Sequence, residues 1–158
     1  MIAFVPFIAL LALGIGCSWL GCIVPFAAIA AAAAVDLRFR AGSALVVCVW
    51  AVSQAAGFGI HHYPRDPSTL AWGAAMLVAV LAAFAAARAL RSRPILAFCA
   101  AFGAFEIVLA IFSVALGGWG AYAPYVLLGL LAVNAAWFLT AQIATAVFLR
   151  LPPLRGIV

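Results

Sequence analysis

Long apolar stretches alternate along this chain with short groups of charged and turn-forming residues. We predict one helix for each apolar stretch, at about residues 2–15, 18–36, 42–60, 68–90, 94–116 and 124–149. Most of these stretches are close to the ~20 residues that a helix needs to cross the ~30 Å hydrocarbon core of a bilayer. The pattern predicts an all-α integral membrane protein in which residues 1–158 form one bundle of six transmembrane helices.

The first apolar stretch, residues 2–35, is too long to be a single span. As one helix it would extend about 50 Å. Gly14, Gly16 and Ser18 offer a break near its middle. We therefore expect a tight turn at residues 14–18 between a short first helix and a second one. The alternative is one tilted helix, which gives five spans.

Turn and capping signals separate the later helices. Residues 61–69 form a polar loop, in which Asp66 followed by Pro67 has the pattern of a helix N-cap. Residues 117–124 are rich in glycine and predict a second loop. The remaining start signals are Ser43 for the third helix, Pro94 for the fifth and Pro124 for the sixth.

The composition excludes a soluble domain. Hydrophobic residues make up 71% of the chain and charged residues 7%, more apolar surface than a soluble core of 158 residues could bury. No segment is long and polar enough for an ATP-hydrolysing domain, and no glycine-rich phosphate loop occurs. No nucleophile has a base partner in the pattern, so we do not expect an enzyme.

The charges are unevenly placed. All eight basic residues are arginines, against three acidic residues. They flank the apolar stretches instead of forming a stripe, which argues against a nucleic-acid partner. With six spans, both termini and seven arginines fall on one side, which the positive-inside rule places in the cytoplasm, as in a bacterial inner membrane. With five spans only the N-terminus changes side. The seven are Arg38, Arg40, Arg88, Arg91, Arg93, Arg150 and Arg155.

The predicted third helix carries a face of polar and aromatic residues. Trp50, Gln54, Gly57 and His61 are spaced four, three and four residues apart, so they share one side of a helix. An amide in hydrocarbon needs a partner, and this face should point into the bundle. Gln54 would either tie two helices together, contributing about 1 kcal/mol, or contact a ligand.

Glu106 is the acidic residue that lies inside a predicted span, and Asn134 lies at a similar depth in the next helix. Carboxylates within membranes are costly and are commonly buried, paired and functional. Proton relay, cation binding and a structural hydrogen bond to Asn134 all fit this position. In the loops, Tyr63, Trp119 and Tyr122 suggest an aromatic cover over a pocket for a partly apolar ligand.

His61 and His62 are candidates for a metal site at the outer end of the third helix. Neutral imidazole is a common ligand of transition metals. Cys17 falls in another turn on the same predicted side, so the three side chains could meet. The alternative is a histidine pair at headgroup depth beside Tyr63. We expect no built-in cofactor.

The predicted fourth helix has alanine at every fourth position. Small residues in register let helix backbones approach closely. The row indicates a flat docking face, directed either within the bundle or towards a partner subunit. Its members are Ala71, Ala75, Ala79, Ala83 and Ala87.

The architecture, together with the motif over residues 50–64 and 69–73, resembles the substrate-binding S-components of energy-coupling factor vitamin transporters, among them the small solitary cobalamin-uptake proteins. The resemblance implies a vitamin bound from the outer side, and a coupling subunit with ATPases as partner. In the cobalamin type, a side chain ligates the cobalt of the bound corrinoid, and His61, His62 or Cys17 would do so here. The first helix departs from the expected Ala-x-x-x-Ala docking pattern, with Ala9 and Leu13.

Three functions are compatible with these features. The first is binding and uptake of a small molecule such as a vitamin; the second is a metal-ion or proton-coupled permease that uses Glu106; the third is an assembly subunit of a larger membrane complex. For the first two, the expected ligand-binding residues are Trp50, Gln54, His61, His62, Tyr63, Glu106, Trp119, Tyr122 and Asn134.

Overall fold

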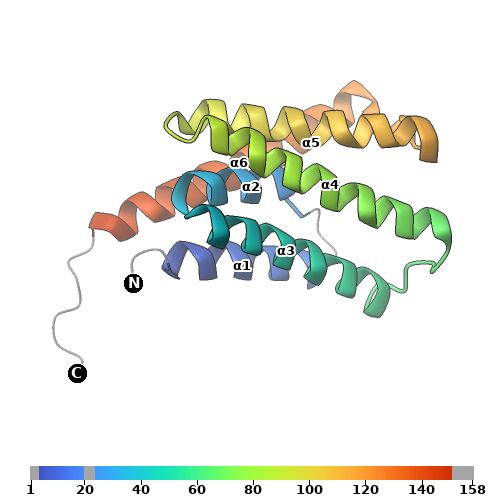
Figure 1. Ribbon diagram of the computed structural model, residues 1–158, viewed down its shortest axis with the longest axis horizontal. Coiled ribbons are helices and arrows are strands. Elements are labelled where there is room, and N and C mark those ends of the chain that lie inside the picture. The colour runs from blue at the N-terminus through green and yellow to red at the C-terminus, as the bar shows by residue number, and fades with distance from the viewer. Residues whose placement is uncertain (1–3, 20–23, 151–158) are drawn as a thin grey trace.

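The computed structural model describes residues 4–19 and 24–150, and these residues form helices and turns without a strand (Figure 1). The predicted all-α fold is therefore confirmed for this part of the chain. The elements are α1 (Phe4–Trp19), α2 (Phe26–Asp36), α3 (Phe39–Gly59), α4 (Pro67–Ala89), α5 (Pro94–Leu116), the short 3-10 helix η1 (Trp119–Tyr122) and α6 (Pro124–Arg150).

Four of the described helices, α3 to α6, are long and apolar enough to cross a membrane. Helix α2 is apolar but has only 11 residues, a length of about 16 Å. That is about half of a hydrocarbon core, so α2 does not cross it alone. Of the six predicted spans, the structure supports four.

The predicted turn at residues 14–18 is wrong. Helix α1 continues through these residues to Trp19, and α2 begins after Pro25. Gly14 serves packing instead of a turn, because a Cβ at this position would come within 2.5 Å of a Val49 methyl group on α3. Pro25 has no amide N–H to donate, which suits the residue before the first turn of a helix.

Helix α3 begins at Phe39, earlier than the sequence predicted. Only Leu37 and Arg38 separate it from the end of α2. Ser43 is consequently inside the helix, where its hydroxyl donates to the carbonyl of Arg40 at 3.2 Å. It does not act as the predicted N-cap.

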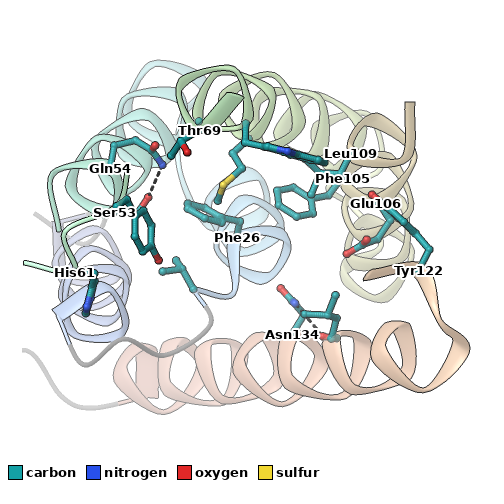
Figure 2. Close-up of a pocket in the computed structure, with 16 residues that line it drawn as sticks. Phe26, Ser53, Gln54, His61, Thr69, Phe105, Glu106, Leu109, Tyr122 and Asn134 are labelled. Atoms are coloured by element: carbon teal, nitrogen blue, oxygen red, sulfur yellow. Dashed lines mark hydrogen bonds between the residues drawn. The ribbon is translucent and has the colours of Figure 1, made fainter. Parts of the chain in front are cut away.

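Helix α2 lies at the centre of the bundle, with the other helices around it (Figure 2). Residues 30–34, all alanine, have no exposed surface. A helix that is apolar on every side is expected to be buried. Because alanine projects only a methyl group, the surrounding helices approach the α2 backbone closely.

The C-terminal end of α2 is held by Arg88 of α4. The guanidinium donates to the carbonyl of Ala34 at 2.8 Å and to that of Leu37 at 2.7 Å. Ala34 lies in the last turn of α2 and Leu37 is its C-cap residue. The carbonyls at this end of a helix lack intrahelical partners and carry a partial negative charge. An arginine that the sequence placed in the cytoplasmic group of seven thus caps a buried helix.

Helices α3 to α6 run alternately in opposite directions, which gives the bundle two distinct ends (Figure 1). One end carries the α2–α3 and α4–α5 connections, with Arg38, Arg40, Arg91 and Arg93; we call it the arginine end. Helix α1 begins and α6 ends there as well. The other end, the loop end, carries the α3–α4 loop and η1.

The outer surface of α5 and α6 is strongly apolar. More than half of the side chain is exposed at each of a series of large residues on these two helices. A contiguous surface of this kind is unusual in soluble monomers and suits contact with lipid. The residues include Ile107, Ile111, Val114, Leu128 and Ile143.

Candidate functional site

A cavity of about 500 Å³ lies in the half of the bundle nearest the loop end. It occupies the part of the bundle centre that α2 does not fill. Val24 and Phe26, at the start of α2, form its floor, while the buried alanines of α2 lie beyond them. The cavity therefore adjoins the N-terminal end of α2.

Each of α2 to α6 contributes to the cavity wall (Figure 2). The aromatic members are Phe26, Tyr63, Trp72, Phe105 and Tyr122. The polar members are Ser53, Gln54, His61, Thr69, Glu106 and Asn134. The remaining residues are Val24, Gly73, Met76, Leu109 and Leu130. Six of the nine predicted ligand-binding residues belong to this set, which the structure draws from four separate segments.

Asn134 of α6 is buried and fixed at both ends of its amide. Its Oδ1 accepts a hydrogen bond from the backbone N–H of Ala28 at 3.1 Å, and its Nδ2 donates to the carbonyl of Leu130 at 2.9 Å. Ala28 lies in the first turn of α2, where backbone N–H groups have no intrahelical partner. The alternative of a hydrogen bond between Asn134 and Glu106 is not found, because the amide is used to cap α2.

Glu106 lies near the middle of α5, partly buried, and faces the cavity beside Tyr122 (Figure 2). In the described part of the chain, no side chain forms a hydrogen bond or an ion pair with its carboxylate. Burial raises the pKa of the Tyr122 phenol above its ordinary value of 10.0, and the negative charge of Glu106 raises it further. The two residues are thus electrostatic neighbours.

Gln54 lines the cavity, close to Gly73 of α4. A Cβ at Gly73 would lie 2.5 Å from Gln54 Oε1, so the glycine makes room for the amide. Gln54 Nε2 reaches the hydroxyl of Ser53 at 3.4 Å. This is a weak contact within α3, so Gln54 does not tie two helices together by a hydrogen bond.

Trp50 does not line the cavity. Its indole Nε1–H donates to the carbonyl of Gly73 at 2.9 Å and so joins α3 to α4. The predicted ligand contact of Trp50 is therefore not one with the wall of this cavity, because the indole is directed towards α4. Trp50 instead supports the wall that Gln54 and Gly73 form.

Residues 61–63, in the loop that follows α3, differ in where their side chains lie. His62 adopts φ = 54°, in the left-handed region, and turns the chain so that the N–H of Tyr63 donates to the carbonyl of Gly57 at 3.0 Å. The Tyr63 ring covers Gly57. The centroid of the His61 ring lies 6.1 Å from the centroid of the Tyr63 ring. His61 and Tyr63 line the cavity, whereas His62 is exposed and does not.

The predicted metal site is not formed as a group of ligands. The residues that the structure describes contain no group of three or more histidine, cysteine or acidic side chains that could hold a metal ion. Cys17 is buried within α1, and His62 is exposed and does not line the cavity. A single bond from His61 to the cobalt of a bound corrinoid remains a prediction.

The loop after α5 contains one turn of 3-10 helix, η1, where the sequence predicted only a loop. Gly117 and Gly118 precede it with φ of 80° and 111°, values that favour glycine. Trp119 is exposed and meets the edge of the Tyr122 ring at a centroid distance of 5.8 Å. Tyr122 therefore lines the cavity, and Trp119 covers Tyr122 from outside.

The alanine row of α4 lies inside the bundle. Ala75, Ala79 and Ala83 have no exposed surface, and Ala71 is only partly exposed. The row packs in the interior of the bundle, the first of the two directions that the sequence left open. It is not an exposed docking surface for a partner subunit.

Several wall residues were not among the predicted site residues. Phe105 and Leu109 lie one residue before and three after Glu106, so helical spacing could have indicated them. Trp72 lies one residue before Gly73 in the motif over residues 69–73. Phe26 had no signal, because its role depends on where α2 begins.

No family model matches this chain, and no curated protein and no solved structure does either. What the cavity binds therefore has to follow from the chemistry of its wall.

Proposed function

We propose that this chain is a membrane transport protein that binds a small molecule in the cavity at the loop end of the bundle. The observation that carries the proposal is the partly open cavity beside the start of α2, walled by aromatic and polar side chains within apolar helices. Its volume of about 500 Å³ is typical of sites that hold a drug-sized or smaller molecule. Four helices suited to a bilayer support the membrane setting.

The proposed orientation places the arginine end in the cytoplasm of a bacterial inner membrane. Arginine is enriched in cytoplasmic loops, and Arg38, Arg40, Arg91 and Arg93 lie at that end. The loop end would then face outward. Its α3–α4 loop contains one arginine, Arg65. A ligand would enter the cavity from outside, past His61, Tyr63 and Tyr122.

A second candidate function is ion-coupled transport through Glu106. It is favoured by one observation, namely that this carboxylate lies in a span and faces the cavity without a hydrogen bond from the described residues. The two functions separate in one variant. Glu106→Gln should abolish uptake and leave binding of a neutral ligand intact if the carboxylate only carries a proton or ion.

The predicted corrinoid, the coupling subunit and its ATPases remain predictions. Energy-coupling factor proteins use such partners, and purification of the complex from its native membrane would reveal them. The burial of the alanine row means that any coupling subunit has to dock on another surface.

The test of the proposal is mass spectrometry of the small molecule that the gently purified protein retains. Leu109→Trp places a large side chain into the cavity. Ile107→Trp is its matched control, because Ile107 is on the same helix and is 62% exposed. We expect the wild type and the Ile107 variant to retain the molecule and the Leu109 variant to lose it.

Equal retention by the Leu109 variant would show that the molecule binds elsewhere. Absence of any retained molecule, together with absence of uptake by cells that produce the protein, would contradict the transport function itself.

A further inference from the structure

The charge of the cavity wall has one sign. The described residues that line the cavity include one carboxylate, that of Glu106, and no arginine. The arginines at residues 38, 40, 88, 91 and 93 belong to the opposite half of the bundle. His61 is the basic member of the wall, and Figure 2 shows it on the other side of the view from Glu106.

No protein group compensates the charge of Glu106. The described side chains offer its carboxylate neither a hydrogen bond nor an ion pair. Asn134, which could have donated, uses its Nδ2 on the Leu130 carbonyl. A carboxylate in an apolar region is costly unless it is paired or neutralised. Since no described side chain pairs with it, we take the partner of Glu106 to be a proton or a bound cation.

The rings around the cavity favour an organic cation over a metal ion. Five aromatic side chains contribute to the wall: Phe26, Tyr63, Trp72, Phe105 and Tyr122. The faces of such rings attract alkylammonium groups, tryptophan most strongly. A hard metal ion needs six or more oxygen ligands, and the described residues contain no cluster of three metal-binding side chains.

Resting on the proposed transport function, we propose that the ligand is a small organic cation with an apolar or aromatic body. Its ammonium group lies against Glu106, and its apolar body lies among the aromatic rings. Gln54 Oε1, which accepts no hydrogen bond within the described structure, is left to accept one from the ligand.

The test compares three compounds of similar size on the purified protein in lipid nanodiscs. Phenyltrimethylammonium is the cation, tert-butylbenzene its neutral isostere, and benzenesulfonate an anion. We expect the cation to bind about tenfold more tightly than the neutral isostere, and the anion to bind most weakly. In Glu106→Gln the preference for the cation should fall, because only the rings then favour the cation, while the neutral isostere binds as before.

If Glu106→Gln does not fold, a second measurement on the wild type tests the same proposal. In the wild type, a hydrophobic carbodiimide should modify Glu106, detected by peptide mass spectrometry. Phenyltrimethylammonium should protect Glu106 from the reagent, and tert-butylbenzene should not. Equal protection by both compounds would contradict the proposal.

The outcomes separate the ligand class from the function. Equal or tighter binding of tert-butylbenzene or benzenesulfonate would overturn the cation proposal and leave small-molecule binding intact. A Glu106→Gln variant that folds and keeps the full wild-type preference would also overturn it. If none of the three compounds binds and the protein retains no small molecule, both the ligand class and the proposed function fail.

Discussion

The side-chain Oδ1 of Asn134 accepts a hydrogen bond from the backbone N–H of Ala28 at 3.1 Å, although the two residues are 106 positions apart. This contact fixes the first turn of α2 to α6, as Arg88 fixes the last turn to α4. The intervening residues of α2 are apolar and have no side-chain hydrogen bonds. Gln142 of α6 also donates to the Asp36 carboxylate at the end of α2, at 3.1 Å. Side chains from neighbouring helices therefore hold the central helix at both ends.

Asn134→Ala should destabilise the protein by about 1–3 kcal/mol, because the N–H of Ala28 would be buried without a partner. The free energy of unfolding in detergent measures the effect. Thr140→Ala is the matched control, since Thr140 is exposed on the same helix and its hydroxyl only donates to the carbonyl of Ala136. If both variants are equally stable, the capping role of Asn134 is wrong.

Arg88→Ala should destabilise the protein by about 2–3 kcal/mol, because two carbonyls at the end of α2 lose a charged donor. Arg91→Ala removes the same charge from the exposed α4–α5 connection and should change stability by less than about 0.5 kcal/mol. The comparison is made by denaturant unfolding at two salt concentrations. If both variants lose a similar amount of stability, the effect comes from the loss of positive charge and not from the loss of the helix cap.

Gly57→Ala should alter the cavity without unfolding the protein. A Cβ at Gly57 would lie 2.7 Å from two carbons of the Tyr63 ring, so the ring has to move away from the cavity wall. We expect the affinity for phenyltrimethylammonium to fall about threefold to tenfold. In the control Gly59→Ala, a Cβ meets nothing within 4 Å, and an equal loss of affinity there would contradict the role of the ring.

The start of α4 should loosen in acid. The carboxylate of Asp66 accepts the Thr69 N–H at 2.8 Å, and this hydrogen bond lowers the pKa of Asp66 below its ordinary value of 3.8. A lowered pKa means that the stabilisation is complete above the unfolded value and is lost as pH falls through the folded one. Hydrogen-exchange protection of the Thr69 amide should therefore decrease below about pH 4.

Asp66→Asn serves as the control for this effect. An asparagine also caps helices but does not titrate, so its protection of Thr69 should stay constant over the same pH range. Ser68→Ala should behave as the wild type. A wild-type profile that is flat down to pH 2 would contradict the assignment.

The orientation can be tested with two engineered cysteines in a variant whose four native cysteines are replaced by alanine. Ser68→Cys places a thiol at the loop end and Ser92→Cys one at the arginine end. A membrane-impermeant maleimide should label the first in intact spheroplasts, and the second only after permeabilisation. The reverse pattern would invert the proposed orientation and leave the bundle unaffected.

The sequence predicted the helices that have clear boundaries. Helices α4, α5 and α6 begin where Pro67, Pro94 and Pro124 place them, and Asp66 caps α4 as expected. These signals act locally, on the first turn of a helix, so they can be identified without the tertiary structure. Their positions in the structure confirm that part of the prediction.

The beginning of the chain was misassigned for a tertiary reason. Gly14 and Gly16 suggested a turn, but Gly14 faces Val49 of α3 at a distance that excludes a side chain. A glycine that allows two helices to approach and a glycine that ends a helix have the same appearance in a single sequence. The distinction depends on α3, whose packing the local pattern does not contain.

The candidate site was partly predictable. Three of its residues could be identified from the sequence: Glu106, Gln54 and Tyr63. Polar or amphipathic groups within or beside apolar helices are costly to bury and are commonly functional. Phe26 and Trp72 did not stand out, since aromatic residues are common in such helices. Trp50 lies on the predicted helical face but donates its indole N–H to the Gly73 carbonyl and does not line the cavity.

The length of α2 also determines how deep a ligand can reach. Each turn of helix occupies about 5.4 Å, so one additional turn before Phe26 would displace most of the empty space, and one turn fewer would deepen it. A longer or shorter start of α2 would therefore change the size of the cavity without any alteration to the apolar outer surface of α5 and α6. Binding capacity and membrane insertion would then evolve independently in this architecture.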